Sequence, residues 1–285
     1  MKKFFLTLLF VICISSPLYA VQSTIVDVEG NACMGDDKSR KQTEQVAMAD
    51  AKRSAAERAM THLKSETQVK DFAVEKDLVN AYTQATVKVI QELEKTWFKD
   101  ANSGDCYRIR IEAEVVPDEK AIKEAVTSKV PSDNPGLPLN VSLWTDKKTY
   151  QSGEKIKIYI KWNKPFYARV IYRDAKRESL QLLPNPFRTE NYFNGGVIYE
   201  IPSGNDRFEL EVKPPFGDEH IILYSSTSSL GDISLESEGG VYQVMTKGKD
   251  IGIKTRGVKL KEKSGSNKTQ ASEFFEDTTK IKTGQ

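Results

Sequence analysis

The chain has 285 residues, which exceeds the size of one typical domain and favours two. It carries 42 Lys and Arg residues against 40 Asp and Glu residues. This balance lacks the basic excess with which many proteins gather nucleic acid, so we expect no nucleic-acid partner.

The N-terminal segment has the pattern of a secretory signal peptide. Lys2 and Lys3 precede an apolar run over residues 4–14, and the following stretch ends in the small residue Ala20. The run is shorter than the roughly 20 residues that span a bilayer, and no later segment is longer or more apolar. We therefore expect a signal peptide over residues 1–20, no membrane span, and a periplasmic or secreted protein.

Two elements are expected next. Residues 24–32 alternate between apolar and polar side chains, which predicts a half-buried strand. Residues 39–65 contain no Gly or Pro and predict a helix, whose small-residue face would lie close against a sheet or another helix. The residues that recur along this face are Met48, Ala51, Ala55, Ala59 and Leu63.

A second helix is predicted over residues 78–100, because apolar and aromatic residues recur there at spacings of three and four. They are Leu78, Tyr82, Ala85, Val89, Leu93 and Trp97. Residues 106–115 alternate between apolar and charged side chains, as a strand does, and residues 117–126 begin with Pro and acids, as a short helix does. The first domain, residues 21–126, is therefore expected to have the order β-α-α-β-α.

Two cysteines remain once Cys13 leaves with the signal peptide. Cys33 ends the first predicted strand, and Cys106 begins the next. In an oxidising compartment they form a disulfide if the two strands are antiparallel neighbours. The alternative is two separate buried thiols.

A linker and a second domain follow. Residues 127–138 hold three prolines and one glycine, which disfavours regular structure. Residues 139–262 contain short alternating runs separated by turn signals, which predicts an antiparallel immunoglobulin-like β-sandwich and an α+β fold class. The clearest runs are 139–144, 155–162, 166–173, 179–183, 197–201, 207–212 and 220–224.

The pattern weakens beyond residue 225. Residues 241–245 and 251–260 are each candidates for a further strand. Residues 263–285 are polar enough to predict a disordered tail.

The sequence offers little for catalysis. The two histidines, His62 and His220, belong to different predicted domains. No pattern of His, Cys and carboxylates has the spacing of a metal site, and no nucleophile or phosphate-loop motif occurs. Adjacent acids such as Asp36-Asp37 sit at turns or helix starts, where acids are common. We expect no enzyme, no metal and no cofactor.

Two features are candidates for a partner surface. Tyr159 and Tyr167 lie on the outward faces of their predicted strands, where aromatic residues often contact partners. The stretch 247–263 carries seven basic residues against two acidic ones. It suits an anionic envelope polymer or a lipid headgroup, or alternatively a solvated strand edge that resists aggregation. Its basic residues include Lys254, Arg256 and Lys259.

Five landmarks follow one another in the predicted sandwich: Leu139-x-Val-x-Leu-Trp144, Tyr150-x-x-Gly153-Glu154, Leu183-Pro184-Asn185-Pro186, Tyr199-x-Ile201-Pro202 and Pro214-Pro215-Phe216-Gly217. In that order they resemble a bacterial domain of unknown function found in the C-terminal part of secreted envelope proteins. The resemblance covers about residues 139–226. It implies an accessory or interaction sandwich without catalytic residues.

The strand motif Val28-Glu29-Gly30-x-Ala32 and the Ala-rich helix Ala47–Ala59 are similar to the N-terminal module of the flagellar assembly protein T family and related envelope lipoproteins. The chain departs from them because it lacks a lipid-attachment cysteine, and its remainder does not resemble a flagellar ring protein. The similarity implies assembly work in the periplasm.

These features predict a non-catalytic envelope scaffold or protein-interaction adaptor, in which a disulfide-tied domain carries a sandwich. The expected partner is an envelope protein or an anionic envelope polymer. The alternative is a ligand-binding module, in which the sandwich holds an envelope polysaccharide or a peptidoglycan fragment through exposed aromatic residues and the basic stretch.

Overall fold

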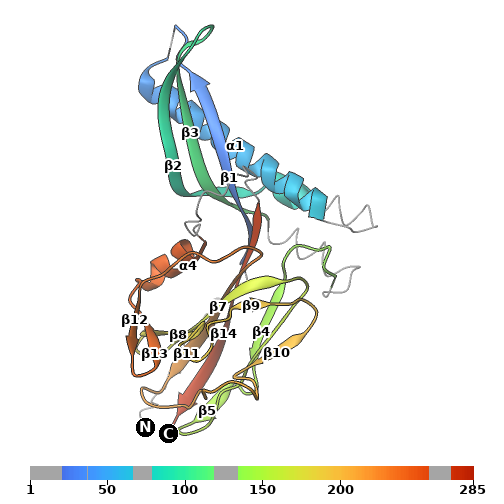
Figure 1. The fold of residues 1–285 in the computed structure, drawn as a ribbon, viewed down its shortest axis with the longest axis vertical. Coiled ribbons are helices and arrows are strands. Elements are labelled where there is room, and N and C mark those ends of the chain that lie inside the picture. The colour runs from blue at the N-terminus through green and yellow to red at the C-terminus, as the bar shows by residue number, and fades with distance from the viewer. Residues whose placement is uncertain (1–20, 37, 67–78, 119–133, 257–270) are drawn as a thin grey trace, which may run out of the picture.

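The computed structural model describes residues 21–36, 38–66, 79–118, 134–256 and 271–285. Within them the chain forms a narrow N-terminal lobe, in which a helix lies along three strands, and a broader lobe of stacked strands (Figure 1). Antiparallel sheet dominates both lobes, so the predicted α+β class and the β-sandwich are confirmed.

The N-terminal lobe is a three-stranded antiparallel sheet with one face covered by a helix. Its elements are β1 (Val21–Cys33), α1 (Arg40–Glu66), β2 (Thr86–Asp100) and β3 (Gly104–Val116), and β3 lies between β1 and β2. The predicted first strand, first helix and second strand are confirmed. The small-residue face of α1 packs directly on β1 and β3, and it buries Ala47, Ala51, Ala55 and Ala59 completely.

The predicted helix over residues 78–100 is wrong for its larger part, because residues 86–100 form strand β2. Two irregularities in the pairing with β3, between Val89 and Gln91 and between Glu92 and Glu94, shift the side-chain alternation. Val89 and Trp97 pack on the core of this lobe, but Leu93, which completes the helical spacing between them, lies at the second irregularity and is 40% exposed. β-branched and aromatic residues and the long pairing with β3 favour the strand.

The second lobe contains two facing sheets. Its elements are β4 (Val141–Thr145), β5 (Thr149–Gln151), β6 (Ile158–Trp162), β7 (Phe166–Arg173), β8 (Ser179–Leu183), β9 (Tyr192–Phe193), β10 (Ile198–Ile201), β11 (Asp218–Ser226), β12 (Leu235–Glu238), β13 (Val241–Val244), α4 (Gly248–Arg256) and β14 (Ser272–Gly284). A small sheet with the order β10-β6-β4 faces the larger sheet. Of the predicted runs, 207–212 contributes only an isolated bridge from Glu211 to Lys155.

The core of the sandwich lies between the two sheets. Ile158, Ile160 and Trp162 of β6 point into it, and inward residues of β7 and β11 meet them. The indole of Trp162 packs edge-on against Phe166, with ring centroids 4.2 Å apart. The prediction that Trp162 belongs to the core is thus confirmed.

Strand β14 overturns the later part of the predicted disordered tail. Residues 272–284 lie inside the large sheet, where β14 pairs antiparallel with β11 on one side and with the first residues of β1 on the other. The large sheet has the order β12-β13-β8-β7-β11-β14-β1-β3-β2, so it runs without a break through both lobes. Figure 1 shows β14 rising from the sandwich to meet β1.

The outer face of the large sheet carries a third cluster of buried apolar residues, which α4 helps to cover. Ile251 of α4 packs there against Ile171, Tyr224 and Phe274. Residues 248–256 are therefore helical, so the predicted strand over 251–260 is wrong for this part. The predicted strand over 241–245 is confirmed as β13.

Several predictions lie outside the described residues. They concern the signal peptide, the helix over 117–126 beyond residue 118, the linker up to residue 133, the end of the strand over 251–260, and the tail over 263–270. The last residues of that linker are described, and Leu137 is buried in the core of the N-terminal lobe. No helix among the described residues combines the length and the apolar character needed to cross a bilayer.

Candidate functional site

The predicted disulfide is confirmed. Cys33 and Cys106 are paired residues at the ends of β1 and β3, and their Cα atoms lie 3.9 Å apart. The bond closes the tip of the N-terminal lobe, far from the sandwich (Figure 1). Its place is that of a structural crosslink between two neighbouring strands.

The polar residues do not assemble into a metal centre in the part of the chain that is described, where no group of three His, Cys, Asp or Glu has suitable geometry. His220 lies on β11, and its burial lowers its pKa, helped by the charges of Lys280 and Arg173. His62 lies on α1, at the junction between the lobes. The two histidines are therefore parts of separate environments.

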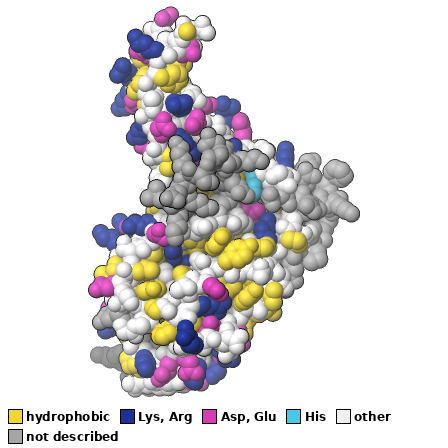
Figure 2. Space-filling model, viewed as in Figure 1, with side chains coloured by type: hydrophobic (Ala, Val, Ile, Leu, Met, Phe, Trp, Pro, Cys, Tyr) yellow, Lys and Arg dark blue, Asp and Glu magenta, His cyan; other side chains and the backbone are white. Residues whose placement is uncertain are grey.

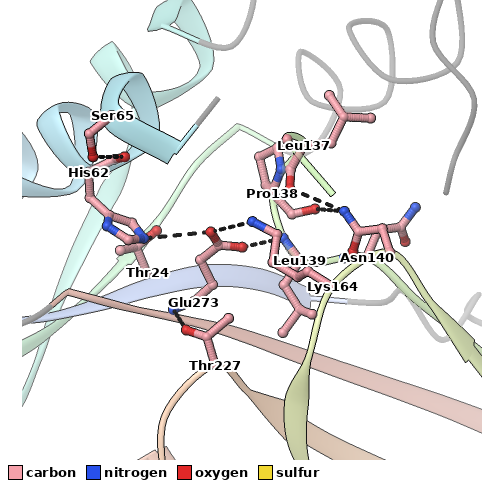
Figure 3. Close-up of polar contacts among 12 residues, drawn as sticks. Thr24, His62, Ser65, Leu137, Pro138, Leu139, Asn140, Lys164, Thr227 and Glu273 are labelled. Atoms are coloured by element: carbon pink, nitrogen blue, oxygen red, sulfur yellow. Dashed lines mark hydrogen bonds and ion pairs between the residues drawn. The ribbon is translucent and has the colours of Figure 1, made fainter. Parts of the chain in front are cut away.

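The junction between the lobes is built around Glu273, as Figure 3 shows. Glu273 lies on β14, and its carboxylate accepts a hydrogen bond from the ammonium group of Lys164 at 2.8 Å. The backbone N–H of Leu139, just before β4, donates to the other oxygen. His62 Nε2 lies 3.5 Å from the same carboxylate, and becomes its ion-pair partner when protonated. One carboxylate thus joins α1, β14 and the start of the sandwich.

The charge state of Glu273 follows from these contacts. Burial alone would raise the pKa of its carboxyl group, but His62, the charge of Lys164 and the N–H of Leu139 outweigh it and lower the pKa. The carboxylate is therefore ionised at neutral pH. Because its partners come from both lobes, its charge stabilises their contact.

Asn163, next to Lys164, fixes the segment that enters the sandwich. Its side-chain nitrogen lies 3.0 Å, 3.1 Å and 3.0 Å from the carbonyl oxygens of Asn134, Leu137 and Pro138. The described end of the predicted linker is therefore held in place by hydrogen bonds and by the burial of Leu137.

Arg256 forms a second buried ion-pair cluster and is not a surface residue. Its guanidinium donates to Glu114 of β3 at 2.7 Å and to Glu276 of β14 at 2.8 Å. Ser23 of β1 donates to the same Glu114 carboxylate at 2.7 Å. Only 11% of the Arg256 side chain is exposed, so its prediction as part of a partner surface is wrong.

The other two basic candidates have different positions. Lys254 is exposed on α4, while Lys259 lies outside the described residues. The described part of the basic stretch is thus a short helix that presents some basic side chains outward and uses Arg256 inward. The alternative prediction, a solvated strand edge, is therefore wrong for residues 248–256, which are helical.

Tyr159 stacks on Trp144 on the outer face of the small sheet. The ring centroids lie 5.7 Å apart with 19° between the planes, and both side chains are half-buried. Beside them, Lys157 pairs with Glu200 at 2.6 Å. This face combines two aromatic rings with charged groups that can form hydrogen bonds.

Tyr167 lies on the other side of the lobe. Its neighbours on β7, Phe166 and Ala168, point into the sandwich core, so Tyr167 points outward from the large sheet. Its ring contacts that of Tyr192, with centroids 5.0 Å apart. Tyr159 and Tyr167 therefore belong to opposite faces and do not form one surface.

Residues 149–229 match the model of a family described as a domain of unknown function, DUF4384. A search of the curated proteins gives no match. The matched segment runs from β5 to just beyond β11 and leaves out β4 and β14, although both strands belong to the sandwich lobe. The domain is thus completed by strands on either side of the match.

The residues of the junction are not predicted by the sequence pattern. Lys164 lies in the loop after β6, and Glu273 lies in the segment predicted to be disordered. No residue near Glu273 in the sequence indicates its role, because its partners Lys164, Leu139 and His62 are each 109 or more positions away.

Proposed function

We propose that the protein is a non-catalytic scaffold or protein-interaction adaptor of the cell envelope, located in the periplasm or secreted. The observation that carries the proposal is the single sheet that runs through both lobes by way of β14. A sheet shared between lobes resists bending at their junction, as an adaptor that presents two surfaces in a fixed arrangement requires.

The two buried ion-pair clusters support the same proposal. Glu273 and Arg256 each contact groups from both lobes or from the strands that join them. Rearranging the lobes would leave these charges buried without partners, which is costly. The lobes therefore behave as one body.

The compartment is supported by the N-terminal pattern and by the disulfide between Cys33 and Cys106. Fractionation of cells that produce the full chain tests it. We expect the protein in the periplasmic or secreted fraction, with its N-terminus at Val21 and no free thiol. Uncleaved protein in the cytosol would overturn the proposed location.

The adaptor function is tested by photo-crosslinking in intact cells. A crosslinking residue is placed at Phe98 in the N-terminal lobe or at Ile198 in the sandwich lobe, whose side chains are 39% and 55% exposed. We expect each position to capture its own envelope protein, and each complex to contain the partner of the other lobe as well. If one partner always excludes the other, or if neither position captures a protein, the adaptor proposal fails.

A second function is favoured by the stacked Trp144 and Tyr159. We propose, as the alternative, that this face binds an envelope polysaccharide or a peptidoglycan fragment, because sugar rings pack their C–H faces on aromatic rings and use neighbouring polar groups for hydrogen bonds. Sedimentation with insoluble peptidoglycan tests it. Tyr159→Ala is expected to abolish retention, whereas Tyr167→Ala on the opposite face is the control and should retain it. Equal retention of both variants would exclude this face.

A further inference from the structure

The outward side of α4 and the residues just before it combine exposed apolar and basic side chains. Met245 and Ile253 are 55% and 53% exposed, and Lys247, Lys249 and Lys254 are also exposed. We call these five residues the α4 surface. Figure 2 shows Lys and Arg side chains gathered at the place of α4, with hydrophobic side chains beside them.

The orientation of α4 is fixed by its inner side. Ile251 is fully buried in the outer cluster of the large sheet, and Thr255 receives a hydrogen bond from the buried Arg169 at 3.0 Å. The carbonyl oxygen of Thr255 also accepts a hydrogen bond from Gly231 N–H at 2.9 Å. Together with the ion pairs of Arg256, these contacts hold the lysines outward before any partner binds.

The three lysines are not neutralised by their surroundings. None of them forms an ion pair with any residue in the described ranges. Asp250, the one acid on α4, is half-buried in the first turn of the helix, where an acid is favourable. The α4 surface is therefore locally cationic although the whole chain is nearly neutral.

We infer that the α4 surface binds the face of an anionic lipid bilayer. The lysines would lie at the phosphate groups, and Met245 and Ile253 would enter the boundary between headgroups and acyl chains. Lysines at the membrane surface are attracted to anionic headgroups, and apolar side chains beside them can be buried at the boundary between headgroups and acyl chains. A hydrated polysaccharide attracts the lysines equally well but gives the two apolar side chains no favourable environment, so the exposed apolar pair favours the bilayer.

The contact is superficial and reversible. α4 has nine residues, and its inner side is committed to the protein core. Only the outward side is free to enter the interface, so binding holds the sandwich lobe against a membrane without changing the fold. Membrane binding would place the proposed scaffold at the bilayer surface, and it does not depend on which proteins the scaffold binds.

Vesicle sedimentation tests the charge requirement. The protein is mixed with phosphatidylcholine vesicles that contain or lack phosphatidylglycerol, and we expect it to bind only the anionic ones. A variant with Lys247→Gln, Lys249→Gln and Lys254→Gln should bind about 100-fold more weakly, because each lysine near an anionic surface contributes about a fivefold factor. If it binds as the unmodified protein does, the inference is wrong.

A matched variant controls for the loss of net charge. Lys41 and Lys52 of α1 and Lys99 of β2 are exposed and belong to the N-terminal lobe, away from α4. Changing all three to Gln removes the same charge and should leave vesicle binding within about twofold of the unmodified protein. An equal loss of binding in both variants would show that net charge alone acts, which would overturn the assignment to α4.

The apolar pair distinguishes a bilayer from a soluble polyanion. A variant with Met245→Ser and Ile253→Ser should lose binding to anionic vesicles by about tenfold or more, since two exposed apolar side chains no longer enter the interface. Its binding to dextran sulfate should not change. If vesicle binding is also unchanged, the surface recognises charge only, and the bilayer proposal is replaced by an anionic polymer. Thermal unfolding of each variant checks that the fold is intact.

Discussion

The ammonium group of Lys164 lies 2.8 Å from the carboxylate of Glu273, although the two residues are 109 positions apart in the chain. Their side chains are only 10% and 7% exposed. Lys164 follows β6 and Glu273 lies on β14, so the pair joins the loop between the two sheets of the sandwich to the strand that continues into the N-terminal lobe. A buried pair of this kind contributes less by its own attraction than by the cost of losing one partner.

The first prediction is that Glu273→Ala destabilises the protein by about 3–5 kcal/mol, because it leaves the ammonium of Lys164 buried without a counter-charge. Denaturant unfolding measures the loss. The control is Glu209→Ala, which breaks an exposed pair with Lys155 and should cost about 1 kcal/mol or less.

A double variant separates the two contributions. Lys164→Met combined with Glu273→Leu removes both charges and keeps apolar volume, so we expect it to be clearly more stable than Glu273→Ala. If Glu273→Ala costs no more than the surface control, the junction is not held by this carboxylate.

The disulfide gives the second prediction. Cys33 and Cys106 are 73 positions apart, and closing a loop of this length stabilises the folded state by about 4 kcal/mol in the chain-entropy model. We expect reduction to lower the free energy of unfolding by about this amount. The variant with Cys33→Ser and Cys106→Ser should match the reduced protein and show no response to reductant. A response of that variant would mean that the reductant acts elsewhere.

Local periodicity was sufficient for β1, α1 and β3. Each of these elements has an unbroken pattern, of period two or of three to four, and each packs one regular face on the core of the N-terminal lobe. β2 was misread because its irregular pairing with β3 breaks the alternation. Periodicity indicates which face a strand presents to the core, and the irregular pairing of β2 shifts that face within the strand.

β14 could not be recognised from its own residues. Phe274, Phe275 and Ile281 are buried, but the polar residues Glu273, just before them, and Thr279, between Phe275 and Ile281, are buried as well, so no alternation of apolar and polar residues remains. The strand is stable because buried partners from other segments satisfy its polar side chains. Those partners, such as Lys164, are visible only once the chain is folded.

The candidate surfaces were predicted in part. The positions of Cys33 and Cys106 at the ends of neighbouring predicted strands, together with the oxidising compartment, predict the disulfide, which is confirmed. The two tyrosines were each expected to point outward, but the sequence does not say which sheet a strand joins, and β6 and β7 belong to different sheets. Its place in a basic stretch predicts that Arg256 is exposed. Ion pairs with Glu114 and Glu276 instead hold its guanidinium in a buried position.

A third prediction concerns Glu219 of β11, whose side chain is fully buried. One carboxylate oxygen accepts a hydrogen bond from Thr283 at 2.8 Å, and no cation pairs with it among the described residues. Burial raises the pKa of Glu219. As the pH falls, Glu219 of the folded protein therefore binds a proton at a higher pH than it does in the unfolded chain.

The sign of the pH dependence follows from this difference. The stability gained by protonating Glu219 is fully present below the usual glutamate pKa of about 4.3 and is lost as the pH rises through the raised folded value. Glu219→Gln keeps the side chain neutral throughout. We expect it to match the unmodified protein near about pH 4 and to be more stable near neutral pH, measured by denaturant unfolding at each pH. A constant difference across this range would show that Glu219 does not titrate in it.

The last prediction tests the close approach of α1 to β1. Gly30 faces α1, and a Cβ atom there would lie 2.7 Å from the Cα atom of Ala51 and closer still to the carbonyl oxygen of Ala47. These are backbone atoms of a helix, which cannot move aside singly, so Gly30→Ala must push α1 away from the sheet. We expect a loss of about 1–3 kcal/mol in unfolding free energy. The control is Gly204→Ala, where a Cβ atom meets nothing within 4 Å and should change stability little. Equal stability of the two variants would mean that the helix does not rest on this strand as closely as described.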